Sequence, residues 1–370
     1  MKKIKVLHFP IRNNIGGVTQ YALNNWKYID KERFQFDFAT LSKNLDYEDE
    51  LIKQGCKVFH ISCYAEDNKT QFAKEINQIL DENYDVIHLH TSYWKTFCIE
   101  EIAKQRKVPK VIVHSHNTMV NINDENERIR ILKIHNLQKR CFTSDLATDF
   151  CACSQMAADW LFGEQIPKDK IRIMKNAIDV EKFSYNENVR NEYRKKLGLE
   201  NCYVLGHVGR FVYQKNHEFL IDVFNEVLKN IPTARLMLIG TGELEIDIRE
   251  KLNKYGIQDK VLFLGKCNDV NYWMQAMDLF LLPSKFEGLP IVLIEAQSAG
   301  LKCLASANIS REAAITDNIE FIPLNGDEWI KSIIRYSKGY ERKNLNDVIT
   351  NAGYNIRYQV RELENLYAGI

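Results

Sequence analysis

Two carboxylates eight residues apart, Glu287 and Glu295, surround a turn that is rich in glycine and proline. The apolar run from Asp278 to Leu282 predicts a short buried strand of a parallel sheet. After the turn, Pro290 suits the first turn of a helix and Gly300 its end. We therefore expect Glu287 in a loop at the carboxyl end of a strand and Glu295 inside the following helix. Open α/β sheets bind their ligands at that edge.

The turn itself reads Gly288-Leu289-Pro290-Ile291. A glycine lets bare backbone N–H groups approach a ligand, and a helix that begins directly afterwards favours negative charge at its N-terminus. A ligand that carries both hydroxyls and phosphates would suit such a turn. The alternative is that Glu287 is a solvated loop residue and Glu295 a charge on an exposed helix face, which is the usual place of an isolated acid.

Cations and glycines follow other expected strands. Tyr203 to Arg210 reads as a strand that ends in Gly-Arg, and Lys215 follows five residues later. A guanidinium and an ammonium at a strand end suit a diphosphate. Gly240 and Gly242 form a glycine turn after another strand but lack the third glycine of a dinucleotide fingerprint. Near the start of the chain, the pair Gly16 and Gly17 opens a helix and permits close approach of phosphate.

Two histidines end the strand expected from Lys110 to His116. A histidine at the carboxyl end of a strand can hydrogen-bond a sugar hydroxyl or act as an acid or base. Metal binding is the competing interpretation, but His114 and His116 would require a third ligand, which the neighbouring sequence does not offer.

Several of these segments resemble one family. Glu-Gly-Leu-Pro at residues 287–290, followed by Glu-Ala-Gln-Ser-Ala-Gly at 295–300, resembles the nucleotide-sugar signature of glycosyltransferase family 4. The phrases His-Ser-His-Asn-Thr at 114–118 and Val-Gly-Arg-Phe-Val-Tyr-Gln-Lys-Asn-His at 208–217 resemble bacterial transferases of capsular, exopolysaccharide or O-antigen assembly. The resemblance extends from residue 16 to residue 300. It implies the GT-B fold, which is two Rossmann-like, doubly wound α/β domains with the active site in the cleft between them, and sugar transfer with retention.

The resemblance also implies a role for each candidate residue. Arg210 and Lys215 would hold the donor diphosphate, and Glu295 the ribose. The donor sugar would contact His116, Glu287, Gly288, Leu289, Pro290 and Ile291, while Gly16 and Gly17 would lie against the pyrophosphate and the acceptor. Catalysis would rest on His116, Glu287, Arg210 and Lys215. No metal or other cofactor is expected, because no Asp-x-Asp motif is present and the two cations would do the work of a metal.

The order of the elements predicts the domain organisation. Strand-like and helix-like segments alternate, which is typical of parallel, doubly wound sheets, and 370 residues exceed one ordinary core. We expect an N-terminal domain at residues 1–178, a nucleotide-sugar domain at 179–345 and a terminal helix at 346–370 that crosses back to the first domain. The charged stretch from Glu181 to Glu200 is interpreted as the linker, and a helix is expected from Asn346 to Tyr367.

Composition narrows the possible partners and compartments. A net charge of +1 argues against recruitment of nucleic acid. Nine cysteines without Cys-x-x-Cys spacing indicate reduced thiols and a cytoplasmic protein, and no apolar run is long enough to span a membrane. Residues 101–140 contain nine Lys or Arg and four Asp or Glu. This basic segment is either an ordinary surface helix or a peripheral contact with the inner face of the cytoplasmic membrane.

The sequence therefore predicts a retaining glycosyltransferase. It would move a sugar from a nucleotide-diphosphate sugar, with a UDP-sugar expected first, to a hydroxyl of a glycan or of a polyprenyl-diphosphate-linked acceptor in bacterial surface polysaccharide synthesis. One alternative is a nucleotide-sugar epimerase of the same fold, which requires no acceptor. Another is a non-catalytic partner subunit, which would be expected to lose its charged site residues.

Overall fold

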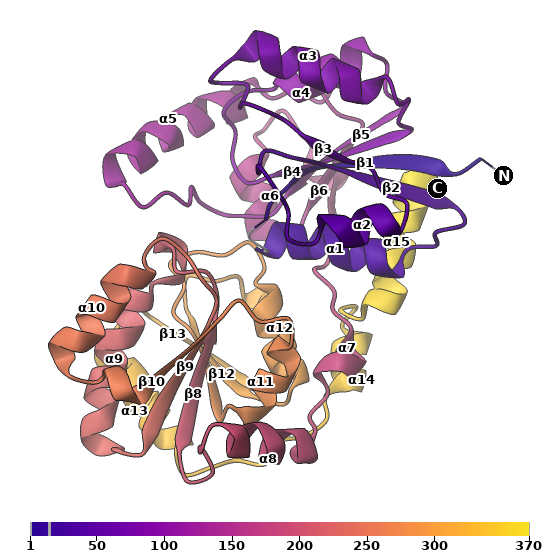
Figure 1. Cartoon of the computed structure of the whole chain (residues 1–370). Helices are drawn as coiled ribbons and strands as arrows, with labels where there is room; N and C mark the ends of the chain where they lie inside the picture. Colours follow the sequence, from indigo (N-terminus) through magenta and orange to yellow (C-terminus); the bar gives the residue numbers. More distant parts are fainter. Residues whose placement is uncertain (1, 14–15, 370) are drawn as a thin grey trace. The chain divides into compact units, whose positions relative to one another are not determined.

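The computed structural model describes residues 2–13 and 16–369 and divides the chain into two compact units. Unit 1 comprises residues 1–120, 124–176 and 356–370, and unit 2 comprises residues 121–123 and 177–355. Each unit is an α/β layered structure around its own parallel sheet, with helices on both faces of the sheet (Figure 1). The prediction of two Rossmann-like domains is confirmed.

Unit 1 contains a seven-stranded sheet in the order β3-β2-β1-β4-β5-β6-β7. Its strands are β1 (Ile4–Ile11), β2 (Phe34–Thr40), β3 (Val58–His60), β4 (Val86–Thr91), β5 (Lys110–Ser115), β6 (Asp149–Ala152) and β7 (Ile171–Ile173). Its helices are α1 (Gly17–Tyr28), α2 (Glu48–Lys53), α3 (Lys69–Leu80), α4 (Cys98–Gln105), α5 (Glu125–Cys141), α6 (Gln155–Leu161) and α15 (Ile356–Ala368). Helix α15 packs beside α1, and its Leu363, Leu366 and Tyr367 complete the core of this unit.

Unit 2 contains a six-stranded parallel sheet in the order β10-β9-β8-β11-β12-β13. Its strands are β8 (Tyr203–Val208), β9 (Ala234–Ile239), β10 (Val261–Gly265), β11 (Leu279–Leu282), β12 (Lys302–Ser306) and β13 (Ile319–Ile322). Its helices are α7 (Val180–Phe183), α8 (Glu187–Lys196), α9 (His217–Asn230), α10 (Glu245–Tyr255), α11 (Val270–Ala276), α12 (Ile291–Ser298), α13 (Gly326–Tyr336) and α14 (Asn346–Asn351). All strands are short and apolar, because both faces of a parallel sheet are covered by helices.

The interpretation of Glu181 to Glu200 as a linker is wrong. Much of it folds as helix α8, whose Arg190 and Arg194 both form ion pairs with Asp278, just before β11. Arg194 is buried and also donates to backbone carbonyls, including that of Cys202 at 2.6 Å. The two arginines lie one helical turn apart, so one face of α8 reaches a single carboxylate.

The long helix expected from Asn346 to Tyr367 is interrupted. It consists of α14, which belongs to unit 2, and α15, which belongs to unit 1. The break contains Gly353, whose φ of 82° is a left-handed conformation that ends a helix. In the part of the chain that the structure describes, no helix has the length and apolar character needed to cross a bilayer.

Candidate functional site

The candidate site in unit 2 lies where the strand order reverses. The chain proceeds outward from β8 through β9 to β10, and then returns to β11 on the other side of β8. The loops that follow β8 and β11 therefore leave the same edge of the sheet next to each other. They are joined by a backbone bond from Lys285 N–H to Gln214 O at 2.8 Å, and by the amide of Asn216, which donates to Pro283 O at 3.2 Å.

An ion pair joins two of the predicted site residues. The Lys215 ammonium donates to Glu287 Oε1 at 2.6 Å, and the side chains are 14% and 9% exposed. The amide of Gln214 donates to the second oxygen of Glu287 at 3.2 Å and to the carbonyl of Phe286 at 3.0 Å. Lys215 and Glu287 are 72 positions apart in the sequence, and they meet because β8 and β11 are neighbouring strands. An ammonium has three N–H donors, so the contact with Glu287 uses only part of what Lys215 offers.

Arg210 lies in the loop that follows β8, five residues before Lys215. The glycine turn after β9 packs against this loop. A Cβ at Gly240 would lie 2.2 Å from the carbonyl oxygen of Gly209, and a Cβ at Gly242 would lie 2.5 Å from that of Phe211. Gly240 also has a φ of 135°, which side chains rarely adopt. The two glycines thus allow backbone to pack against backbone and position Arg210, which is half-buried.

The turn and helix after β11 form as predicted. Pro290 caps α12 at its N-terminus, and the helix ends before Gly300, which has a φ of 68°. Glu295 lies in the helix and is partly buried. Burial raises the pKa of Glu295 to about 7, and the charge of Lys182 opposes this shift. Lys182 belongs to α7, which packs against α12, and no sequence pattern predicted that it lies near the site.

Two histidines in the same unit were missed as neighbours of the cations. His207 donates its Nδ1–H to Leu281 O at 2.8 Å, and its ring meets that of His217 edge to face at 4.7 Å. Burial lowers the pKa of His207 to about 4 and that of His217 well below its usual value. Both rings are therefore neutral, and that of His207 lies next to the backbone of Gly209. The sequence did contain an indication of this, because His207 lies two residues before the Gly-Arg pair and His217 ends the Lys-Asn-His segment.

In unit 1, His116 follows β5 directly at the carboxyl edge and is half-buried, whereas His114 is fully buried within the strand. The N-terminus of α1 begins at Gly17, with Gly16 as its cap. A Cβ at Gly17 would meet nothing within 4 Å, so packing within the fold does not require glycine there. Ile15, which begins the predicted glycine turn, lies outside the described residues.

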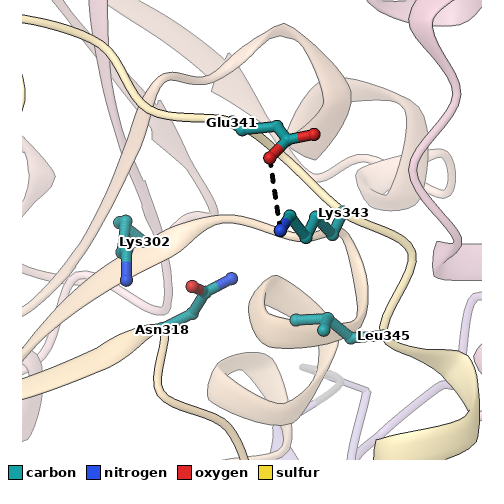
Figure 2. A pocket seen from close by; sticks show the side chains of 5 residues that line it. All are labelled: Lys302, Asn318, Glu341, Lys343 and Leu345. Carbon is teal, nitrogen blue, oxygen red and sulfur yellow. Dashed lines mark ion pairs between the residues drawn. The ribbon is translucent and has the colours of Figure 1, made fainter.

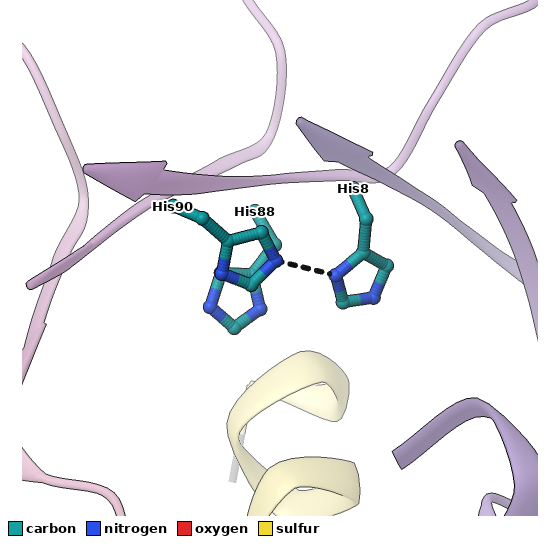
Figure 3. Close-up of side chains that lie close together, drawn as sticks. All are labelled: His8, His88 and His90. Carbon is teal, nitrogen blue, oxygen red and sulfur yellow. Dashed lines mark hydrogen bonds between the residues drawn. The ribbon is translucent and has the colours of Figure 1, made fainter. Parts of the chain in front are cut away.

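His114 and His116 belong to a cluster of five histidines. The others are His8 on β1 and His88 and His90 on β4, and Figure 3 shows His8 bonded to His90 with His88 beside them. Two sets of three nitrogens, from His8, His88 and His90 and from His90, His114 and His116, each lie within 4.8 Å of one another. The neighbouring sequence offers no third ligand to His114 and His116, but the sheet brings His90 to them from β4. In each set, however, one pair of nitrogens already forms a hydrogen bond, at 3.0 Å and 2.9 Å.

A cavity of about 260 Å³ lies elsewhere in unit 2 (Figure 2). It is lined by Lys302, Asn318, Glu341, Lys343 and Leu345. Lys302 begins β12 and Asn318 precedes β13, so this cavity is at the amino edge of the sheet, opposite to the edge that carries Lys215 and Glu287. Its Lys343 pairs with the exposed Glu341 at 3.2 Å. It is not part of the candidate site.

Comparisons with known proteins match both units. The model described as Glycosyltransferase Family 4 matches residues 15–182, and the model described as Glycosyl transferases group 1 matches residues 189–355. The UDP-Gal:alpha-D-GlcNAc-diphosphoundecaprenol alpha-1,3-galactosyltransferase of Escherichia coli is 27% identical over 99% of this chain and 97% of its own. The capsular polysaccharide biosynthesis glycosyltransferase CapH of Staphylococcus aureus is 25% identical over 98% of each chain. Anabaena Alr3699/HepE, solved in complex with UDP and glucose, has the same fold, with a TM-score of 0.78 at 15% identity over the whole of both chains.

Proposed function

Because the chain belongs to the glycosyltransferases, with a family 4 half followed by a group 1 half, we propose that it transfers a sugar from a UDP-sugar to a hydroxyl acceptor with retention. The observation that carries this proposal is the Lys215–Glu287 pair, which joins the loops after β8 and β11 where the strand order of unit 2 reverses. The acceptor would be a glycan on a polyprenyl diphosphate in bacterial surface polysaccharide synthesis. The names of the E. coli and S. aureus relatives support that acceptor and that pathway.

The charges at this edge suit a nucleotide diphosphate. A lone carboxylate beside a diphosphate would repel it, but the ion pair with Lys215 neutralises Glu287. Arg210 then adds net positive charge, with a planar set of donors for phosphate oxygens. These cations would stabilise the charge that develops on the leaving diphosphate, so we propose a reaction that requires no metal.

The donor sugar and the ribose would be bound by the loop after β11, by α12 and by residues of unit 1. Glu287 and the backbone of Gly288 to Ile291 would bind the donor sugar, and Glu295, two turns into α12, the ribose. In unit 1, His116 would contact a sugar hydroxyl, and Gly16 and Gly17 would let the backbone approach the pyrophosphate. Glu287 is engaged by both Lys215 and Gln214, so it is poorly suited to act as a covalent nucleophile. We therefore propose that retention proceeds by attack on the same face from which the diphosphate leaves.

Nucleotide binding is the first test. Melting temperatures would be measured with UDP, GDP, ADP, TDP and CMP and their sugar conjugates, and UDP is expected to give the largest rise. Lys215→Met should weaken UDP binding by about ten- to a hundredfold, since a bond to a charged group is lost. The matched control is Lys251→Met. Lys251 is similarly buried and pairs with Asp222 at 2.7 Å, but it lies on α10, away from the loops of the site.

The outcomes separate the proposal from its alternatives. No shift with any nucleotide would contradict nucleotide-sugar binding and favour a non-catalytic partner subunit. Conversion of a UDP-sugar in the absence of any acceptor, with its epimer as the product, would identify an epimerase. Equal effects of Lys215→Met and Lys251→Met would contradict the placement of the diphosphate.

We further propose that α5 contacts anionic lipid. Its Ile131 and His135 face the unit, while Ile129 and Leu137 are 45% and 62% exposed. Lys133 and Arg140 are exposed as well. Exposed apolar side chains among basic ones are typical of helices that lie on a membrane surface.

Sedimentation with phosphatidylglycerol vesicles tests this proposal. Lys133→Gln combined with Leu137→Gln and Arg140→Gln should reduce the bound fraction. Lys229→Gln combined with Lys254→Gln, on exposed helix surfaces of unit 2, should not. Equal sedimentation of the two variants would leave α5 an ordinary surface helix.

A further inference from the structure

Five of the histidines of unit 1, namely His8, His88, His90, His114 and His116, form with Tyr367 one continuous chain of hydrogen bonds, which we call the histidine chain. His116 Nε2 bonds His90 Nδ1 at 2.9 Å, and His90 Nε2 bonds His8 Nδ1 at 3.0 Å. His8 Nε2 meets the Tyr367 hydroxyl at 3.4 Å, and that hydroxyl bonds His88 Nδ1 at 2.7 Å. His88 Nε2 bonds His114 Nδ1 at 3.1 Å. Every internal nitrogen of the chain is therefore used.

The register of the sheet explains why these rings meet. His8 lies opposite His88 across β1 and β4, and His90 lies opposite His114 across β4 and β5. Residues two apart on a strand share a face, so all five side chains are on one side of the sheet. Tyr21 of α1 packs against the rings of His114 and His116, the two ends of the chain, and Tyr367 of α15 lies in its middle, between His8 and His88. The chain thus crosses the point where the strand order of unit 1 reverses.

Each member of the chain contributes one proton. Burial lowers the pKa of all five histidines, that of His90 to about 3, and raises the pKa of Tyr367, so the rings and the phenol are neutral. A neutral imidazole donates through one nitrogen and accepts through the other. The Tyr367 hydroxyl could accept from both His8 and His88, but its own buried proton would then have no acceptor among the described residues, because these two rings are its only partners there. The bonds of the chain therefore all point in the same direction, either toward His116 or toward His114.

The far end of the chain selects the direction. Nε2 of His114 is buried and has no hydrogen-bond partner among the described residues. If the bonds pointed toward His114, this nitrogen would carry a buried N–H without an acceptor, which is rarer and less favourable than an unused lone pair. The bonds should therefore point toward His116, so that His90 Nδ1 donates to His116 Nε2 and the proton of His116 resides on Nδ1.

We propose that His90 is a positioning residue for His116, and that the histidine chain makes His116 present an Nδ1–H donor to an oxygen of the donor sugar. This inference rests on the proposed function for the identity of the ligand. It assigns a role to four histidines and one tyrosine that the candidate site had left unused. It also predicts that a hydrogen-bond acceptor on the sugar is recognised there.

The tautomer can be measured without substrate. In ¹⁵N-histidine-labelled protein, long-range proton–nitrogen spectra should show His116 protonated at Nδ1 in the wild type. His90→Leu should move that proton to Nε2. His90→Asn should retain the wild-type tautomer, because the asparagine amide can donate from the position of Nδ1 and accept through its oxygen.

Binding gives the second readout. His90→Leu should weaken the UDP-sugar by about tenfold, the effect of one hydrogen bond, and leave UDP alone unchanged. His90→Asn should bind both as the wild type does, and His116→Ala should add little to His90→Leu. His60→Asn, an exposed histidine outside the chain, is the control.

Three results would overturn the inference: His116 protonated at Nε2 in the wild type, equal loss of UDP and UDP-sugar binding in His90→Leu, or stoichiometric Zn²⁺ held by these imidazoles. The proposed function fails separately. If the wild type binds no nucleotide, the proposed function is refuted, whereas the tautomer of His116 is still read from the spectra.

Discussion

Acid should destabilise unit 1 steeply, because below about pH 6.5 its histidine chain stays neutral in the folded state, whereas the same histidines become charged in the unfolded state. An unfolded histidine has a pKa near 6.5, and folding lowers the pKa of each ring in the chain by burial. A lowered folded pKa means that the unfolded chain binds more protons below pH 6.5, so stability falls as the pH falls. From pH 7 to pH 5.5 the loss is about 1.3 kcal/mol for each ring and roughly 6 kcal/mol for five.

One buried acid of the same unit acts in the opposite direction. Burial raises the pKa of Glu100 to about 8, so this carboxyl stays protonated in the fold and favours folding increasingly as the pH falls. Over the same interval it contributes about 2 kcal/mol. Burial also lowers the pKa of His135 in this unit, to about 4, which adds about 1 kcal/mol to the loss. The net loss is then about 5 kcal/mol, a large part of the 5–15 kcal/mol that stabilises typical domains.

Urea unfolding at pH 7.0, 6.25 and 5.5 measures this loss. His8→Phe should reduce the fall by about 1.3 kcal/mol, since one titrating ring is removed and an aromatic ring remains. His60→Asn should not reduce it, because the pKa of His60 is raised and its contribution has the opposite sign. If His8→Phe does not fold, proton NMR of the wild-type rings gives the same information. Ring signals that titrate near pH 6.5 in the folded protein, or stability that is constant from pH 7 to 5.5, would refute the reasoning.

Three further predictions concern single contacts. Lys215→Met and Glu287→Gln should each lower the free energy of unfolding by about 2–3 kcal/mol, and the double variant by clearly less than their sum, because each single change removes the ion-pair partner of a buried charge. Additive losses of unfolding free energy in urea would contradict the pair. Gly240→Ala should lower the free energy of unfolding by about 3 kcal/mol or more, because its Cβ would clash with the backbone of Gly209. Gly256→Ala should lower it by only about 1 kcal/mol, because the added Cβ meets nothing within 4 Å. Equal losses of melting temperature in the two variants would contradict the close approach to Gly209. As the pH rises from roughly 5 to 8, the free energy of unfolding of the wild type should fall, relative to that of Glu100→Gln, by about 1.4 kcal/mol per pH unit. If the two proteins show the same dependence of stability on pH, the pKa of Glu100 is not raised by burial.

The alternation of strands and helices predicted both sheets, because it depends on local patterns that each segment carries by itself. The charged stretch around α8 was misinterpreted since its partner, Asp278, lies more than 80 residues further along the chain. The polar residues resemble a solvated linker, whereas two of them, Arg190 and Arg194, converge on the partly buried carboxylate of Asp278. Charge pattern alone does not distinguish these cases.

The candidate site was predictable to the extent that its residues follow strand ends. Glu287 and Lys215 were found in this way, but their pairing depends on β8 and β11 being neighbours, which no local pattern states. The histidine chain was hidden for the same reason. His8, His88 and His90 each look like ordinary residues of a buried strand, and only the order β1-β4-β5 and its register bring them to His116.

The two carboxyl edges differ in charge in a way that matches the two parts of a nucleotide sugar. In unit 2 the loops at this edge carry Arg210 and the Lys215–Glu287 ion pair. In unit 1 the edge ends in a neutral imidazole whose protonation is fixed by four other rings and a phenol. A diphosphate requires charge, whereas a sugar hydroxyl requires a directed hydrogen bond that does not become an ion pair at mildly acidic pH.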